Sequence, residues 1–78
     1  MKYVIVKIGG VEFPLLFARE LGHDEVADAV GRAAVIAAGF VDIDAARAVC
    51  SGMSTSLDVK SRRAKDADLI MRWLSEKR

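Results

Sequence analysis

The first seventeen residues hold the pattern that most constrains the fold of this chain: two strand-like segments separated by two glycines. Residues 2–8 alternate or run apolar in the β-branched manner of a strand. Gly9 and Gly10 tolerate positive φ, as a tight hairpin turn requires. Residues 11–17 would then return antiparallel to the first segment. Because Pro14 has no N–H to donate, this second strand is expected at a sheet edge or with a bulge.

A short helix is predicted over residues 24–30. Gly22 and His23 precede it, acidic residues occupy its first turn, and apolar residues follow at helical spacing. The next stretch, residues 33–43, is apolar nearly throughout and could continue the helix or form a buried strand. Its Gly-Phe-Val sequence favours a strand that begins near residue 34 or 35.

Residues 44–46 predict a turn, and residues 47–54 a fourth strand. Propensity alone also allows a helix over residues 44–51, because Asp44 could cap it, so both interpretations stay open. Leu57 and Val59 alternate with polar residues, which indicates a short extended segment with one buried face.

A closing helix is predicted from residue 63 to residue 77, with Ser61 as a capping residue. Its apolar residues span an arc of about 200° at 100° per residue. Since one sheet face covers less than that, part of the helix is expected to meet a second subunit or a partner. The expected interaction surface consists of Leu69, Met71 and Trp73.

The predicted fold is α+β, in one domain over residues 1–78: a small antiparallel sheet of hairpin plus second strand pair, one short helix, and the C-terminal helix packed on the sheet. A chain of 78 residues with one cysteine has no internal disulfide, and no Cys and His cluster offers a structural zinc site. Self-association, most simply as a homodimer, is the remaining way to stabilise so small a core.

No residue set predicts a catalytic site, a metal site or a cofactor. Cys50 has no neighbouring histidine in sequence, and it is expected to be a small buried residue of a strand. The single histidine, His23, is explained by a position at a helix start. The hydroxyl-rich residues 51–56 match neither a phosphate loop nor a nucleophile elbow. Gly9 and Gly10 lack the rest of a dinucleotide fingerprint.

The basic group Lys60, Arg62, Arg63 and Lys65 is the sharpest functional feature. Residues 60–78 carry seven Lys and Arg against three Asp and Glu, whereas the whole chain has a net charge of +1. Clustered cations beside a helix N-terminus can bind phosphates or carboxylates. An overall pI near 7.9 is low for a nucleic-acid-binding protein.

The longest uncharged stretch, residues 33–41, is far shorter than the roughly 20 apolar residues of a membrane-spanning helix. The first residues lack the pattern of a signal peptide. Together with the unpaired Cys50, these features predict a soluble, cytoplasmic protein without membrane contact.

The runs HDEVADAVG, AAGFVDI and SGMSTSLDVKSRRAKDADLI resemble a group of small uncharacterised proteins encoded by phages, prophages and related mobile elements. The resemblance covers residues 23–70. It implies a hairpin, a short helix, an A-G-F strand, an S-x-S-L-x-x-K-S segment and a final helix, but no activity. The chain departs from that group in its alanine-rich residues 33–38 and in RRAKD.

Two functional classes follow from these observations. The first is a non-enzymatic protein-interaction module, self-associating, that serves a mobile element as an accessory or host-modulating protein through the last helix and a sheet edge. The alternative is a small nucleic-acid-binding regulator that uses residues 60–65. An enzyme ranks third.

Overall fold

The computed structural model describes residues 1–45 and 47–76 and shows an α+β fold. The fold class expected from the sequence is therefore confirmed. In chain order the elements are β1 (Lys2–Ile8), β2 (Val11–Phe17), α1 (His23–Val30), a short 3-10 turn (Arg32–Ala34), β3 (Val35–Ile43), β4 (Ala48–Ser51), β5 (Met53–Ser54), β6 (Val59–Lys60) and α2 (Ala64–Glu76).

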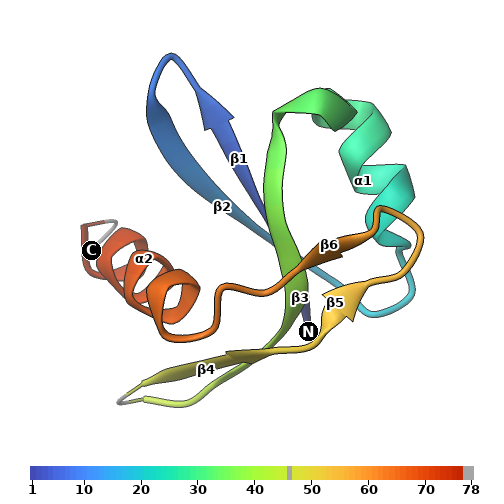
Figure 1. Ribbon diagram of the computed structural model, residues 1–78. Helices are drawn as coiled ribbons and strands as arrows, with labels where there is room; N and C mark the ends of the chain where they lie inside the picture. The colour runs from blue at the N-terminus through green and yellow to red at the C-terminus, as the bar shows by residue number, and fades with distance from the viewer. Residues whose placement is uncertain (46, 77–78) are drawn as a thin grey trace.

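The main sheet has the strand order β2–β1–β3–β4, and all neighbouring strands are antiparallel. Strands β5 and β6 pair separately. Figure 1 shows α1 and α2 on opposite sides of the sheet, with β5 and β6 crossing near β3. The sheet therefore carries two cores, one under each helix.

The expected N-terminal hairpin is confirmed. β1 and β2 pair in register from Lys2↔Phe17 to Ile8↔Val11. Gly9 and Gly10 have φ of 58° and 78°, the positive values that a two-residue hairpin turn requires at both positions. β2 is an edge strand with no strand on its outer side, so the missing N–H of Pro14 deprives no neighbouring strand of a donor there.

The middle of the chain follows the expected helix and strand. α1 begins at His23, and the N–H of Gly22 donates a 2.9 Å hydrogen bond to Oε1 of Glu25, which caps it. Residues 35–43 form a strand and not a continued helix. Residues 48–51 also form a strand, so the helix kept open for residues 44–51 is absent; Ala46, in the expected turn, lies outside the described residues.

The expected fourth strand over residues 47–54 was too long. The chain breaks at Gly52, which has φ of 79°, and continues as the short strand β5. Of the expected extended segment, Val59 and Lys60 form β6, whereas residues 55–58 form a turn. In that turn the backbone N–H of Leu57 donates to Oγ of Ser54 at 3.3 Å, a local bond that competes with strand pairing.

The two cores lie on alternate side chains of β1. Tyr3 and Ile5 face α2, and Val4 and Val6 face α1. The α2 side is completed by Ala37, Val41, Cys50, Ala67, Leu69 and Ile70, and the α1 side by Phe17 and Ala38. The chain at the end of β4 passes close to β3 at Gly39. The position requires glycine, because a Cβ there would lie 2.5 Å from the carbonyl oxygen of Ser51.

The closing helix begins at Ala64, one residue later than expected, and Lys77 lies outside the described residues. Ser61 lies three residues before the helix, and its Oγ accepts a 2.9 Å hydrogen bond from the N–H of Arg63, which precedes the first helical residue; the predicted cap is thus not formed by Ser61.

Candidate interaction site

The start of α2 is held against the sheet by a buried tyrosine and a buried carboxylate. The hydroxyl of Tyr3 donates a 2.6 Å hydrogen bond to Oδ2 of Asp66, and both residues are fully buried. The Ser61 hydroxyl lies 2.6 Å from the same tyrosine oxygen. Burial, and next the hydrogen bond to Asp66, raise the pKa of Tyr3. The tyrosine therefore stays a neutral donor and fixes where the helix begins.

Arg62 belongs to this network and is not free to bind an anion. Its Nε donates to Oδ1 of Asp66 at 2.6 Å, and its two terminal nitrogens donate to Glu12 at 2.8 and 3.2 Å. The hydrogen bonds from Arg62 lower the pKa of Glu12, and those to Glu12 raise the pKa of Arg62. The expectation that Arg62 forms part of an anion site is corrected, because both edges of its guanidinium are occupied.

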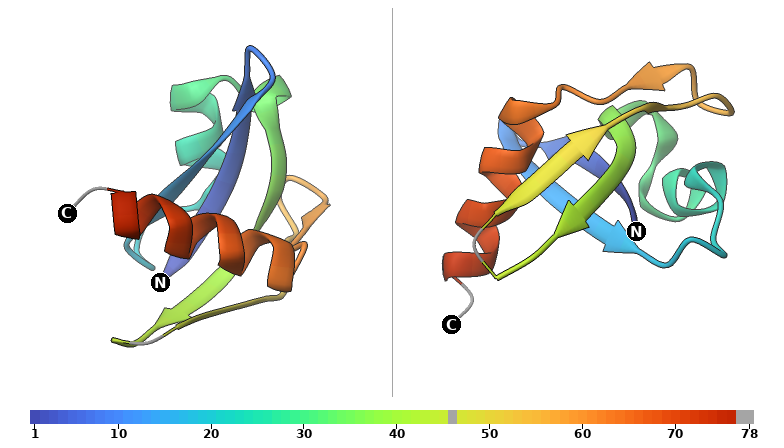
Figure 2. Two further views of the ribbon diagram at one scale, coloured as in Figure 1. Left: turned by 90° about the vertical axis from the view of Figure 1, so that its left-hand side faces the viewer. Right: turned by 90° about the horizontal axis from the view of Figure 1, so that it is seen from below.

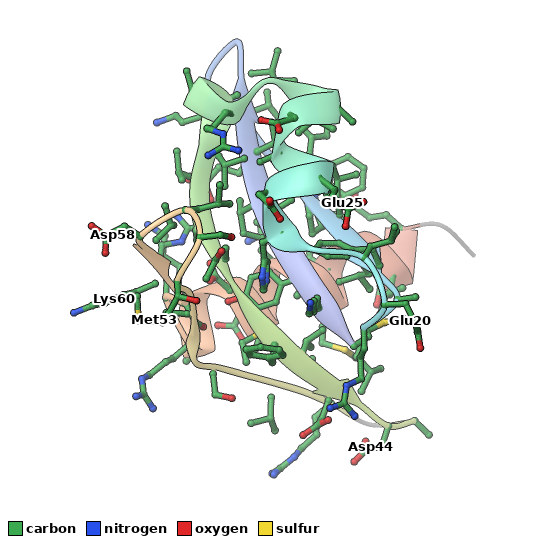
Figure 3. The ribbon with its side chains drawn as sticks, turned by 90° about the vertical axis from the view of Figure 1, so that its right-hand side faces the viewer. Glu20, Glu25, Asp44, Met53, Asp58 and Lys60 are labelled. Carbon is green, nitrogen blue, oxygen red and sulfur yellow. The ribbon has the colours of Figure 1, made fainter. Side chains whose placement is uncertain are left out.

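The other members of the basic group, Lys60, Arg63 and Lys65, are exposed and form no ion pair within the described residues. Lys60 points away from the protein on the β5–β6 arm, which also carries Asp58 (Figure 3). The structure thus leaves three of the four basic residues without an ion pair among the described residues.

The interaction surface expected on α2 is largely covered by the chain itself. Leu69 is 7% exposed and belongs to the core. The ring of Trp73 packs on Phe13 with centroids 5.2 Å apart, and Met71 is partly buried. Strand β2 flanks this side of the helix, so the broad apolar arc meets both the sheet and the hairpin. The expectation that Leu69 belongs to an interaction surface was therefore wrong, because it is a core residue.

Strand β4 has one side without a strand neighbour. The direction of its backbone groups follows from two hydrogen bonds of Val41, whose N–H and C=O both pair with Met1, on the β1 side. The N–H and C=O groups of successive residues point to opposite sides of a strand, so those of Asp42 point to β4. Asp42 therefore pairs with Val49 through backbone hydrogen bonds. The N–H and C=O groups of Ala48 and Cys50 consequently point to the open side, where no backbone partner occurs among the described residues.

A groove of about 360 Å³ lies along this open side, between β4 and the first turns of α2. The backbone bond from Ser61 to the carbonyl of Gly52, at 3.0 Å, places the start of α2 beside the end of β4, and Figure 2 shows the helix running back along the strand. The groove is lined by small side chains and by three charged ones: Ala48, Val49, Cys50, Ala64 and Ala67, with Arg47, Arg63 and Asp68.

Cys50 and His23 do not form a catalytic pair. Cys50 is 5% exposed on the α2 side, and burial raises the pKa of its thiol to about 11, so it stays protonated at neutral pH. His23 lies on the α1 side, edge-on to Phe17 and Phe40, and its Nε2 donates to the carbonyl of Gly39 at 2.9 Å. Cys50 thus has the buried strand position that the sequence predicted, and His23 has the predicted position at a helix start.

Within residues 1–45 and 47–76, no group of three or more His, Cys, Asp or Glu side chains could hold a metal ion. No helix in that part of the chain is long and apolar enough to cross a membrane.

Comparison with protein families, with curated proteins and with solved structures finds no match.

Sequence reasoning missed the groove. It named a sheet edge as a contact without locating it, and the only local signal is a strand of small residues, AVCS, with neither lysine nor proline to protect its edge.

Proposed function

We propose that the chain is a non-enzymatic protein-interaction module, and that its binding element is the groove between β4 and α2. The observation that carries the proposal is the pair of residues Ala48 and Cys50, whose backbone groups face an open groove and have no backbone partner in the described part of the chain. An extended segment of another protein chain placed there would form main-chain hydrogen bonds and extend the sheet.

The size and lining of the groove support an extended segment as the occupant. Ala48, Ala64 and Ala67 present only methyl groups, so a backbone can approach both the strand and the helix. A volume of about 360 Å³ lies at the small end of binding pockets and suits a few residues of peptide.

We also propose that the module self-associates. Phe40 and Val49 are 42% and 46% exposed on neighbouring strands, and burying such apolar side chains stabilises association. Light scattering on the eluting protein should give a homodimer mass, and Val49→Glu should reduce it to a monomer mass. A monomer at every concentration would remove self-association from the proposal.

The accessory role in a mobile element and the cytoplasmic location, both expected from the sequence, belong to this proposal.

The groove is tested with Ala48→Pro. Proline removes an N–H that points into the groove while leaving the bonds between β3 and β4 in place. Wild-type chain immobilised on a surface should retain a protein from a host lysate that Ala48→Pro does not retain, provided that both have the same circular dichroism. Equal retention by the two chains would contradict a groove-based function.

A further inference from the structure

We infer that the segment bound between β4 and α2 is an acidic extended peptide, with an Asp or Glu side chain at the end of the groove where Arg63 lies. This inference rests on the proposed function and specifies the chemistry of its partner.

The charges along the groove are unevenly distributed. Arg63 comes directly before α2, and Ser61 ties this point to the end of β4. Asp68 lies one turn further along the helix, toward the start of β4, where Arg47 also lines the groove. Of the charged residues that line the groove, Arg63 is therefore the one at the end beside Gly52, whereas Arg47 and Asp68 bring both signs to the other end.

Arg63 is available to a ligand. It is exposed and forms no ion pair within the described residues. The neighbouring Arg62 differs, since Glu12 and Asp66 occupy it. The positive end of the α2 dipole adds to the field at Arg63, so a carboxylate there gains from both.

The geometry of a strand decides where that carboxylate stands in the peptide. A segment that pairs with Ala48 and Cys50 places alternate side chains toward α2. Those in the middle meet Ala64 and Ala67, which accommodate small apolar groups, whereas the one at the Cys50 end meets Arg63. The expected ligand therefore has apolar and acidic residues at alternate positions, with the acid at one end.

The test uses random heptapeptides displayed on phage and selected on the immobilised full chain. The selected sequences are then synthesised and titrated by fluorescence anisotropy. We expect enrichment of Asp and Glu, a loss of at least tenfold in affinity for Arg63→Glu, and weaker binding as salt rises. Arg72→Glu is the matched control, because it makes the same charge change on the same helix at a site that does not line this groove; its affinity should stay within twofold of wild type.

Each other outcome overturns the inference in a recognisable way. Selected peptides that are neutral or basic, or equal losses for Arg63→Glu and Arg72→Glu, would exclude the acidic ligand while leaving the groove intact if Ala48→Pro still abolishes binding. Binding that survives Ala48→Pro would overturn the proposed function as well. No selection above background, or a dimer that Ala48→Pro dissociates, would exclude an acidic peptide as the occupant.

Discussion

The hydroxyl of Tyr3 donates a 2.6 Å hydrogen bond to the carboxylate of Asp66, and so joins the first strand to the last helix across 63 residues of chain. Both side chains are fully buried. This bond, with Arg62 and Ser61 around it, sets the position of α2 beside β4, and hence the width of the proposed binding groove.

Tyr3→Phe should destabilise the fold by about 1.5–3 kcal/mol, the usual range for a buried hydrogen bond to a charged group. The phenyl ring keeps the packing, so the loss reports the hydroxyl. Urea unfolding followed by circular dichroism measures it. Ser61→Ala serves as a milder control, and an unchanged midpoint for Tyr3→Phe would show that Asp66 has no need of the tyrosine.

Arg62→Ala should destabilise the fold by about 1.5–3 kcal/mol, the range for hydrogen bonds to a charged group, since it leaves the buried Asp66 without its cationic partner. If Arg62 instead bound an anion, the variant would lose DNA or RNA retention in a low-salt gel-shift assay while keeping its stability. Thermal melts and gel shifts on the same preparation separate the two roles, with Arg72→Ala as the exposed control.

Stability should fall in alkaline solution because two buried acids hold their protons in the folded state. The pKa of Cys50 is raised from 9.0 to about 11, and that of Tyr3 is raised as well. Between pH 9.0 and about pH 11, the two pKa values of Cys50, the unfolded chain loses the cysteine proton and the folded chain keeps it. Unfolding therefore becomes more favourable by up to about 1.4 kcal/mol per pH unit. Cys50→Ala should flatten the decline above pH 9 in urea titrations, and an identical slope would contradict the assignment.

Trp73→Ala should lower the stability of the isolated chain by about 2–3 kcal/mol, because the indole packs on Phe13 and against the core. It should leave the oligomeric state unchanged. Light scattering alongside chemical unfolding distinguishes this from an intermolecular role, in which Trp73→Ala would dissociate the assembly at constant monomer stability. Arg72→Ala, on the exposed side of α2, is the control.

Local patterns in the sequence were sufficient for most of the secondary structure. The glycine pair between apolar runs specified the hairpin and Pro14 indicated an edge strand, because each depends only on backbone conformations available to neighbouring residues. The length of β4 was harder to predict, since it is limited by Gly52 and by the crossing at Gly39, two features far apart in sequence.

The partners of the charged and aromatic side chains were decided only by the tertiary structure. Arg62 and Arg63 are adjacent and chemically identical, yet one is bound by Glu12, fifty residues away, and the other faces an open groove. Likewise, the apolar arc of α2 determined that something must cover it, and the fold supplied β2 as the cover. The physical reason is the same in both cases: periodicity and propensity act over a few residues, whereas burial and pairing depend on which distant segments the sheet brings together.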